Sequence, residues 1–180
     1  MAVIVYYVAA SLDGFIGTLE GGVDWLAPFE KRAQDHGYAE FYATVDAVLV
    51  GGRTYDACLE HGEWPFPGKP CWVLTRQDRK VTRPEVTFTD REPLEMAREL
   101  ERRAIKRAWL VGGGELAGAF REAGLIDEYI ISHIATIMGD GIPIFGFSSQ
   151  KANLTLLESK TYPDGVVQSH YRCATPKSRT

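Results

Sequence analysis

The chain has 180 residues, a length that suits one domain with a single hydrophobic core. Hydrophobic residues make up 45% and charged residues 24%, which are ordinary proportions for a soluble globular protein. The net charge of −4 argues against a nucleic-acid-binding protein, because such proteins hold phosphates with an excess of basic residues, but it permits a small phosphorylated ligand held by a few local cations.

Predicted strands alternate with predicted helices through the first two thirds of the chain. The continuous apolar run at residues 3–10 is typical of a strand covered on both faces. A helix is marked by Tyr38, Phe41, Tyr42 and Val45, and it begins either there or nearer Pro28. Further strands are predicted at 46–50, 70–75, 86–89 and 107–111, and further helices at 53–59 and from Pro93, with Leu94, Ala97 and Leu100 inward.

The pattern changes in the last third. Leu116, Ala119, Phe120 and Ala123 recur at helical spacing and predict one more helix. Strand-like segments follow at 127–137, 153–162 and 166–173, and the Tyr-Pro-Asp-Gly turn at 162–165 predicts an antiparallel hairpin. We therefore predict an α/β fold of three layers, with a mostly parallel central sheet, flanking helices and an antiparallel C-terminal hairpin. It forms one domain over residues 1–175, with a frayed polar tail at 176–180.

No segment predicts a membrane span, a targeting signal or a metal site. The longest apolar candidate, residues 43–52, is too short to span a bilayer and contains Asp46. The N-terminus starts directly with an apolar run and lacks the basic stretch of a signal peptide. The three cysteines are far apart and the four histidines are scattered, so we expect neither a disulfide framework nor a bound metal, and we expect a cytoplasmic location.

Three consecutive glycines, Gly112, Gly113 and Gly114, stand between a predicted strand and a predicted helix. Residues without a Cβ atom let the backbone approach a ligand closely. The first turn of the following helix directs N–H groups and its positive dipole end at a phosphate. The triplet therefore fits a nucleotide site, although a plain tight turn between strand and helix explains it equally well.

Two other predicted strands end in residues suited to an anion. Arg53 and Thr54 follow one strand, and Thr75 and Arg76 end another. Ligands gather at the carboxyl ends of the strands in an open α/β sheet, and the planar guanidinium of arginine matches a phosphate. Taken singly, each arginine is equally well explained as a solvated charge in a loop, and Thr54 as the cap of its helix. Taken together, the strand ends predict a clamp for a dinucleotide.

Motifs spread over residues 2–173 support a family resemblance. They lie at 11–16, 24–26, 46–51, 54–55, 74–76, 110–116 and 125–128. In this order they resemble the dihydrofolate-reductase-like superfamily, and specifically the branch that contains the reductase domain of riboflavin biosynthesis, the C-terminal part of the fused deaminase-reductase. These motifs are specific for the fold and much less specific for the substrate.

The resemblance implies NADPH as the cofactor. It places the nicotinamide against Ala9 and Ile16, and the adenosine 2′-phosphate against Thr75 and Arg76. One departure is that glycine stands at position 52, where the family usually has a basic residue. The affinity for NADPH relative to that for NADH therefore stays open. The cofactor-binding residues implied are Ala9, Ile16, Gly17, Gly51, Gly52, Arg53, Thr54, Leu74, Thr75, Arg76, Val111, Gly112, Gly113, Gly114, Glu115 and Leu116.

The catalytic acid has two candidates. Alignment without gaps at Trp25 places Glu30 where the pterin-reducing branch holds its substrate with a carboxylate, but Glu30 also fits a solvated ion pair on a helix face. Asp24 is the alternative acid, and it equally fits a helix cap or turn. Trp25 and Phe29 are expected to form the apolar wall of the substrate cleft, or else part of the core.

The predicted function is that of a stand-alone NADPH-dependent oxidoreductase. It would transfer a hydride to a small heterocyclic or C=N substrate, in a reaction similar to that of 5-amino-6-(5-phosphoribosylamino)uracil reductase. No zinc-deaminase motif is present, and no basic cluster for a ribose phosphate is evident on the substrate side. The alternatives are dihydrofolate reductase activity and an NADP-binding protein without catalysis. The resemblance also suggests a homodimer formed through the C-terminal strands, with no nucleic-acid or membrane partner.

Overall fold

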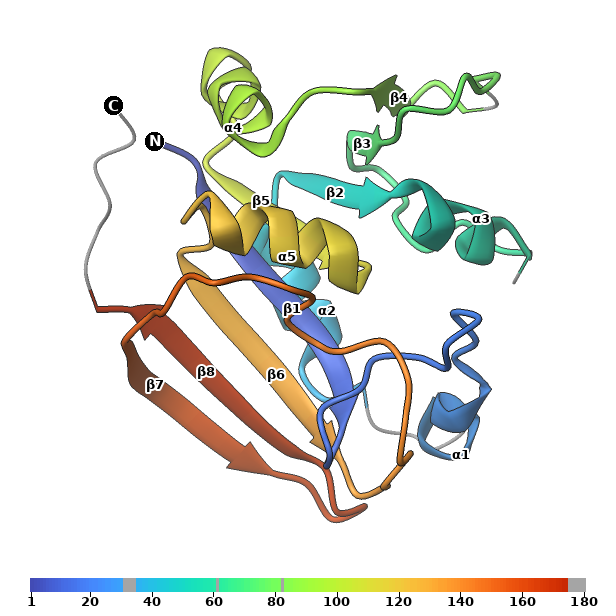
Figure 1. Ribbon diagram of the computed structural model, residues 1–180, viewed down its shortest axis with the longest axis vertical. Helices are drawn as coiled ribbons and strands as arrows, with labels where there is room; N and C mark the ends of the chain where they lie inside the picture. The colour runs from blue at the N-terminus through green and yellow to red at the C-terminus, as the bar shows by residue number, and fades with distance from the viewer. Residues whose placement is uncertain (31–34, 61, 82, 175–180) are drawn as a thin grey trace.

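The structure is a computed structural model that describes residues 1–30, 35–60, 62–81 and 83–174 (Figure 1). Within these ranges eight strands form one sheet in the order β4-β3-β2-β5-β1-β6-β8-β7. The strands are β1 (Val3–Ser11), β2 (Ala47–Gly51), β3 (Cys71–Leu74), β4 (Val86–Thr89), β5 (Arg107–Gly112), β6 (Glu128–Ile134), β7 (Leu154–Thr161) and β8 (Val167–Cys173).

The sheet is parallel from β4 to β6 and antiparallel at the β8–β7 edge. Tyr162, Pro163, Asp164 and Gly165 form the turn between the last two strands, where the Gly165 amide donates to the Tyr162 carbonyl over 3.0 Å. Gly165 has a φ of 90°, a conformation that glycine adopts without strain. The mixed sheet and the C-terminal hairpin are therefore confirmed.

Helices cover the two faces of the sheet. They are the short 3₁₀ helix η1 (Asp24–Leu26), α1 (Ala27–Glu30), α2 (Tyr38–Thr44), α3 (Gly52–Glu60), α4 (Pro93–Arg102) and α5 (Gly114–Glu122). In Figure 1, α5 crosses in front of the sheet and α2 lies behind it. No helix among the described residues is long and apolar enough to cross a lipid bilayer.

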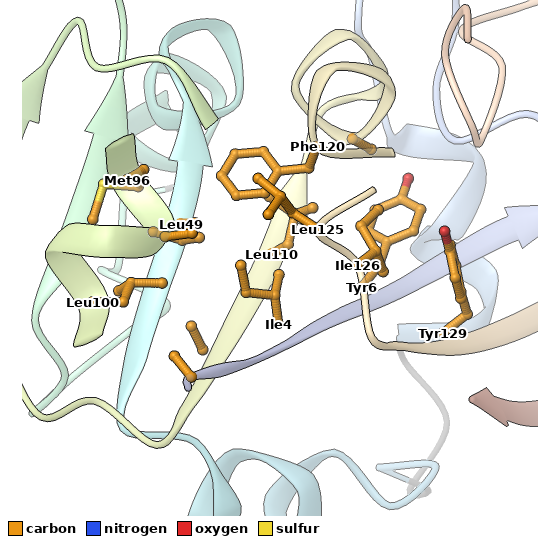
Figure 2. Close-up of a cluster of buried hydrophobic side chains, with 14 of the residues drawn as sticks. Ile4, Tyr6, Leu49, Met96, Leu100, Leu110, Phe120, Leu125, Ile126 and Tyr129 are labelled. Carbon is orange, nitrogen blue, oxygen red and sulfur yellow. The ribbon is translucent and has the colours of Figure 1, made fainter. Parts of the chain in front are cut away.

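Successive residues of the buried strands pack into two separate hydrophobic cores, one on each face of the sheet, because side chains alternate between the faces. Ile4 and Tyr6 of β1 join the core under α4 and α5, which also contains Met96 and Phe120 (Figure 2). Val5 points the other way, into the core under α2 and α3. The continuous apolar runs of the sequence thus correspond to strands buried on both faces.

The structure decides where the predicted helices and the sixth strand begin and end. The helix marked by Tyr38 begins at that residue and not nearer Pro28, because Gly37 adopts a left-handed φ of 78° directly before it. The helix predicted from Leu116, Ala119, Phe120 and Ala123 is α5, in which Phe120 is buried while Ala119 and Ala123 are exposed. Gly118 is also buried, since the backbone of residues 146–147 lies against it. The strand predicted at 127–137 is shorter than expected and ends at residue 134.

Candidate functional site

The carboxyl ends of β2, β3 and β5 meet at one edge of the sheet, where glycines let the backbones approach. A Cβ atom on Gly51 would lie 3.4 Å from the carbonyl oxygen of Gly112, the last residue of β5. A Cβ atom on Gly52 would lie 3.0 Å from Thr75 Oγ1, after β3, which is tighter than ordinary van der Waals contact. The three predicted strand ends therefore touch one another.

The glycine triplet leads directly into α5. Gly113 is the residue before the helix, and no side chain in the described structure caps this N-terminus. A Cβ atom on Gly113 would lie 3.3 Å from Thr54 Oγ1 in the first turn of α3. The N-terminal ends of α3 and α5 therefore adjoin, and both helices direct backbone N–H groups and positive dipole ends to the same place. The Gly112–Gly113 peptide bond is cis.

Residues 14–17, which follow β1, are held against the start of α5 by a short stretch of antiparallel pairing. The Ile16 amide donates to the Ile142 carbonyl, and the Ile142 amide donates to the Gly17 carbonyl, each over 2.9 Å. Ile16 Cδ1 would lie 3.7 Å from a Cβ atom on Gly114, and Pro143 O would lie 2.7 Å from it. The structure thus brings Ile16 to the glycine triplet, while Gly17 pairs with Ile142 in the loop beside it.

Asp13 fixes the loop that follows β6. Its carboxylate accepts hydrogen bonds from the amides of Met138 over 3.1 Å and Gly139 over 2.7 Å. Hydrogen bonds from Ser11 and Gly139 lower the pKa of Asp13 to about 2, so the carboxylate is charged near neutral pH. The loop after β6 is therefore held on one side by an ionised group.

Both predicted arginines lie at this edge, and each forms an ion pair. Arg53 pairs with Glu115 across the gap between α3 and α5, and the two side chains are 72% and 82% exposed. Arg76 pairs with Glu92 at 3.0 Å, and these side chains are 85% and 66% exposed. Ion pairs this exposed contribute only about 0–1 kcal/mol to stability, so an arriving phosphate can replace the carboxylates.

A shallow pocket of about 210 Å³ lies between the ends of β3 and β4 and the first turns of α4 and α5. Four predicted cofactor residues line it, together with Arg91, which the sequence analysis missed. Arg91 lies two residues after the end of β4, so a search for basic residues after each predicted strand would have found it. The lining residues are Leu74, Thr75, Arg76, Asp90, Arg91, Glu92, Pro93, Leu116 and Ala119. A larger cavity of about 290 Å³ lies at the opposite end of the sheet, near Val3 and Tyr129, away from the predicted residues.

The residues predicted to bind the substrate are described less fully than those predicted to bind the cofactor. Asp24 is exposed at the start of η1, and Val23 rather than Asp24 is the residue before that helix. Trp25 is half-buried, and its indole N–H is shielded from solvent without an acceptor among the described residues. Phe29 is also half-buried. The Glu30 side chain lies outside the described residues, so the choice between Glu30 and Asp24 stays a prediction.

A polar group that the sequence analysis missed lies beside Ala9. Ser132 of β6 pairs in register with Ala9 of β1, and Tyr7 lies on the same face. The Gln168 amide nitrogen donates to Ser132 Oγ over 3.0 Å and to the Tyr7 hydroxyl over 3.4 Å. Burial raises the pKa of Tyr7 to about 12, so its hydroxyl keeps its proton at neutral pH. Three strands thus present hydroxyl and amide groups next to the predicted nicotinamide residue.

The described residues contain no group of three histidine, cysteine, aspartate or glutamate side chains placed to hold a metal ion. Cys58, Cys71 and Cys173 are not joined in disulfides, and the Cys173 thiol donates to the Ile126 carbonyl over 3.2 Å. Burial raises the pKa of Cys71 to about 12, so this thiol stays protonated and unreactive.

Comparison with known proteins gives the chain a family. The model of the RibD C-terminal domain matches residues 2–168. The uncharacterised protein YwjB of Bacillus subtilis is 36% identical over 172 residues, which cover 93% of this chain and 95% of YwjB. A second uncharacterised protein of that organism, YyaP, is 31% identical over 179 residues, with 93% of each chain covered.

Solved structures agree. A putative riboflavin biosynthesis protein from Shewanella sp. PV-4 superposes with a TM-score of 0.86 at 27% identity, covering 97% of this chain and 100% of its own. The deaminase and 5-amino-6-(5-phosphoribosylamino)uracil reductase of Thermotoga maritima gives a TM-score of 0.72 at 17% identity, with 96% of this chain and 57% of that one covered, which shows the shared fold. The chain therefore belongs to the RibD C-terminal domain family and has its dihydrofolate-reductase-like fold.

Proposed function

We propose that this protein is an oxidoreductase that binds NADPH and reduces a small heterocyclic or C=N substrate. The observation that carries the proposal is the meeting of three strand ends at Gly51, Gly52 and Gly113, with the starts of α3 and α5 side by side. A glycine-lined surface at two adjoining helix N-termini suits a pyrophosphate, because backbone N–H groups can reach it without obstruction.

The residues at this edge fit a dinucleotide. A side chain at position 51 would press on the backbone of Gly112, and one at position 113 would press on Thr54, so glycine at both positions lets the strand ends and helix starts meet where a pyrophosphate would bind. Arg53 and Arg76 are exposed and held only in weak ion pairs, so they are available to phosphate groups. When bound, the nicotinamide supplies the hydride, and the protein supplies orientation and electrostatics.

The substrate would lie on the α2 side of β1, beside Ala9. Ser132 offers a hydroxyl at that place, which suits a ring nitrogen or carbonyl of a small heterocycle, and the Gln168 amide nitrogen positions it while also donating to the His36 carbonyl over 3.1 Å. Trp25 and Phe29 would supply an apolar wall. The Thermotoga relative carries a uracil reductase in its name, so a pyrimidine is the first substrate class to test.

The test is titration of the purified protein with NADPH and NADH, followed by nicotinamide fluorescence and by calorimetry. We expect saturable binding that Gly113→Val weakens by at least about tenfold, since the added side chain occupies the phosphate surface next to Thr54. Ala123→Val is the matched control, because Ala123 is exposed at the other end of α5. Absence of binding of either coenzyme, or binding indifferent to Gly113→Val, would contradict the proposal.

Turnover is then measured as oxidation of NADPH in the presence of pyrimidine, pterin and imine panels. Oxidation with a pyrimidine or an imine supports the proposed activity. Oxidation with dihydrofolate alone favours the dihydrofolate reductase alternative, and tight binding without oxidation of any panel member favours an NADP-binding protein without catalysis.

A further inference from the structure

Gly52, the first residue of α3, leaves room for side chains from the loop after β3. A Cβ atom on Gly52 would lie 3.0 Å from Thr75 Oγ1 and 3.5 Å from Nη2 of Arg79. Any side chain at position 52 would therefore press against Thr75 first. The space at the start of α3 is taken instead by Arg79, whose guanidinium comes from 27 positions further along the chain.

Arg79 is held firmly, unlike the other arginines of this edge. Its Nη1 and Nη2 both donate to the Asp56 carboxylate, the second over 2.8 Å, and Nη2 also donates to Gln77 Oε1 over 2.8 Å. The Arg79 side chain is only 18% exposed, against 72% for Arg53 and 85% for Arg76. The Arg79 guanidinium therefore has a defined position beside Gly52, where Asp56 partly neutralises its charge.

One donor of Arg79 is left without a partner among the described residues. Asp56, one turn into α3, pairs with the guanidinium and raises the pKa of Arg79 above its ordinary value, so the charged form is favoured where it lies. The Arg79 Nε–H group is shielded from solvent and has no acceptor among the described residues. An unsatisfied buried donor costs free energy, which a new acceptor would recover.

The surrounding groups suit a phosphate monoester. Thr75 Oγ1 accepts a hydrogen bond from the Gln77 amide over 3.1 Å, and a hydroxyl that accepts can donate at the same time. Arg76 follows Thr75 directly and lies at the rim of the adjacent pocket. A compact dianion placed here would meet one fixed guanidinium, one exposed guanidinium and one hydroxyl.

We propose that Arg79 is a specificity-determining residue that binds the 2′-phosphate of NADPH, together with Thr75 and Arg76. This inference rests on the proposed function. It also accounts for glycine at position 52: the positive charge is supplied from the loop after β3, and the missing side chain makes room for it. NADH lacks the 2′-phosphate, so Arg79 favours NADPH over NADH.

The experiment compares two nucleotides that differ only in the 2′-phosphate, adenosine 2′,5′-bisphosphate and adenosine 5′-monophosphate. Calorimetry gives the affinity of the purified protein and of Arg79→Leu for each. We expect Arg79→Leu to lower affinity for the bisphosphate by about tenfold or more, as for the loss of a charge-assisted hydrogen bond, and to leave that for the monophosphate unchanged. Arg83→Leu is the matched control: Arg83 lies in the same loop and faces Glu85 at 3.9 Å.

Two further variants keep the test decisive where Arg79→Leu does not fold. Arg79→Lys retains the charge but not the paired geometry, and we expect an intermediate affinity for the bisphosphate. Asp56→Asn removes the carboxylate that competes for the guanidinium, and we expect tighter bisphosphate binding with monophosphate binding unchanged.

The outcomes separate this inference from the proposed function. Equal weakening for both nucleotides makes Arg79 a structural residue and overturns the inference. Unchanged bisphosphate binding in Arg79→Leu also overturns the inference. So does a wild-type protein that binds the two nucleotides equally well. In each of these cases, binding of NADH and NADPH would still support the proposed function. A wild-type protein that binds no nucleotide and no coenzyme overturns both.

Discussion

The ion pair between Arg53 and Glu115 spans the entrance to the proposed pyrophosphate surface. Because both side chains are largely exposed, the pair adds little to stability and mainly neutralises Arg53. We expect Glu115→Gln to tighten NADPH binding by about two- to fivefold with an unchanged melting temperature, since Arg53 is released and a negative charge at the start of α5 is removed. Coenzyme titration and thermal denaturation measure the two effects.

Glu101→Gln serves as the control for this change. Glu101 is exposed in α4, so its substitution removes one negative charge away from the proposed site. Weaker NADPH binding in Glu115→Gln would mean that Glu115 itself contacts the ligand, as its place among the predicted cofactor residues allows. Equal tightening in both variants would indicate a general effect of net charge.

At the scale of elements, a carboxylate joins three strands at the end of the sheet opposite the proposed site. Glu128 of β6 is buried and accepts hydrogen bonds from Arg107 of β5 over 2.8 Å and from Arg172 of β8 over 3.0 Å. His170 Nε2 lies 3.1 Å from the same carboxylate. Burial alone would raise the pKa of Glu128, but the two guanidinium groups outweigh it and hold the pKa below its ordinary value of 4.5.

This shift predicts acid sensitivity with a definite sign. A carboxylate with a lowered pKa in the folded state contributes its full stabilisation above its unfolded pKa of about 4.5, and the contribution is lost as the pH falls through the folded-state value. We expect Glu128→Gln to lower the free energy of unfolding at pH 7 by about 2 kcal/mol, because Arg107 loses a buried partner while Arg172 is partly solvated.

Denaturant unfolding at pH 7 and at pH values from 5 down to 3 checks this prediction. The Glu128→Gln variant is expected to show a flatter loss of stability with acid than the unsubstituted protein. Glu95→Gln, an exposed position in α4, is the control and keeps the full acid dependence. Parallel curves for Glu128→Gln and the unsubstituted protein would contradict the role of Glu128.

At the scale of the whole molecule, β7 is an uncovered edge. All eight of its residues are exposed, including Leu156 at 52% and Leu157 at 42%. An edge strand with unpaired backbone groups and exposed leucines is prone to pair with another chain. We therefore keep the homodimer as a proposal, with β7 of each copy at the interface.

The expected result is a dimer in sedimentation equilibrium that Leu156→Lys together with Leu157→Lys converts to a folded monomer. Leu59→Lys is the control, since Leu59 is exposed to a similar degree, 41%, at the end of α3. A monomeric wild-type protein at micromolar concentration, or a dimer unaffected by the two lysines, would remove β7 from the interface.

Much of the fold follows from local sequence patterns. Apolar runs predicted the buried strands, and a proline-aspartate-glycine turn predicted the hairpin. Both structures depend on the backbone preferences and polarity of a few consecutive residues, which the sequence shows directly. The glycine triplet and the arginines after two strands likewise pointed to one edge of the sheet, since parallel strands must place their carboxyl ends together.

Other features depend on contacts between distant segments. The buried face of α5 includes Gly118 because Phe147 backbone atoms would lie 3.2 Å from a Cβ atom there, and glycine carries no apolar signal that a periodicity could detect. Ser132 comes beside Ala9 through strand pairing, and Arg79 reaches Gly52 through the course of a loop. Local patterns and the geometry of parallel strands set the helices, the strands, the sheet and the edge proposed to hold a ligand, so these could be predicted from the amino-acid sequence. The side-chain contacts at that edge depend on long-range packing, so they became visible only in the folded molecule.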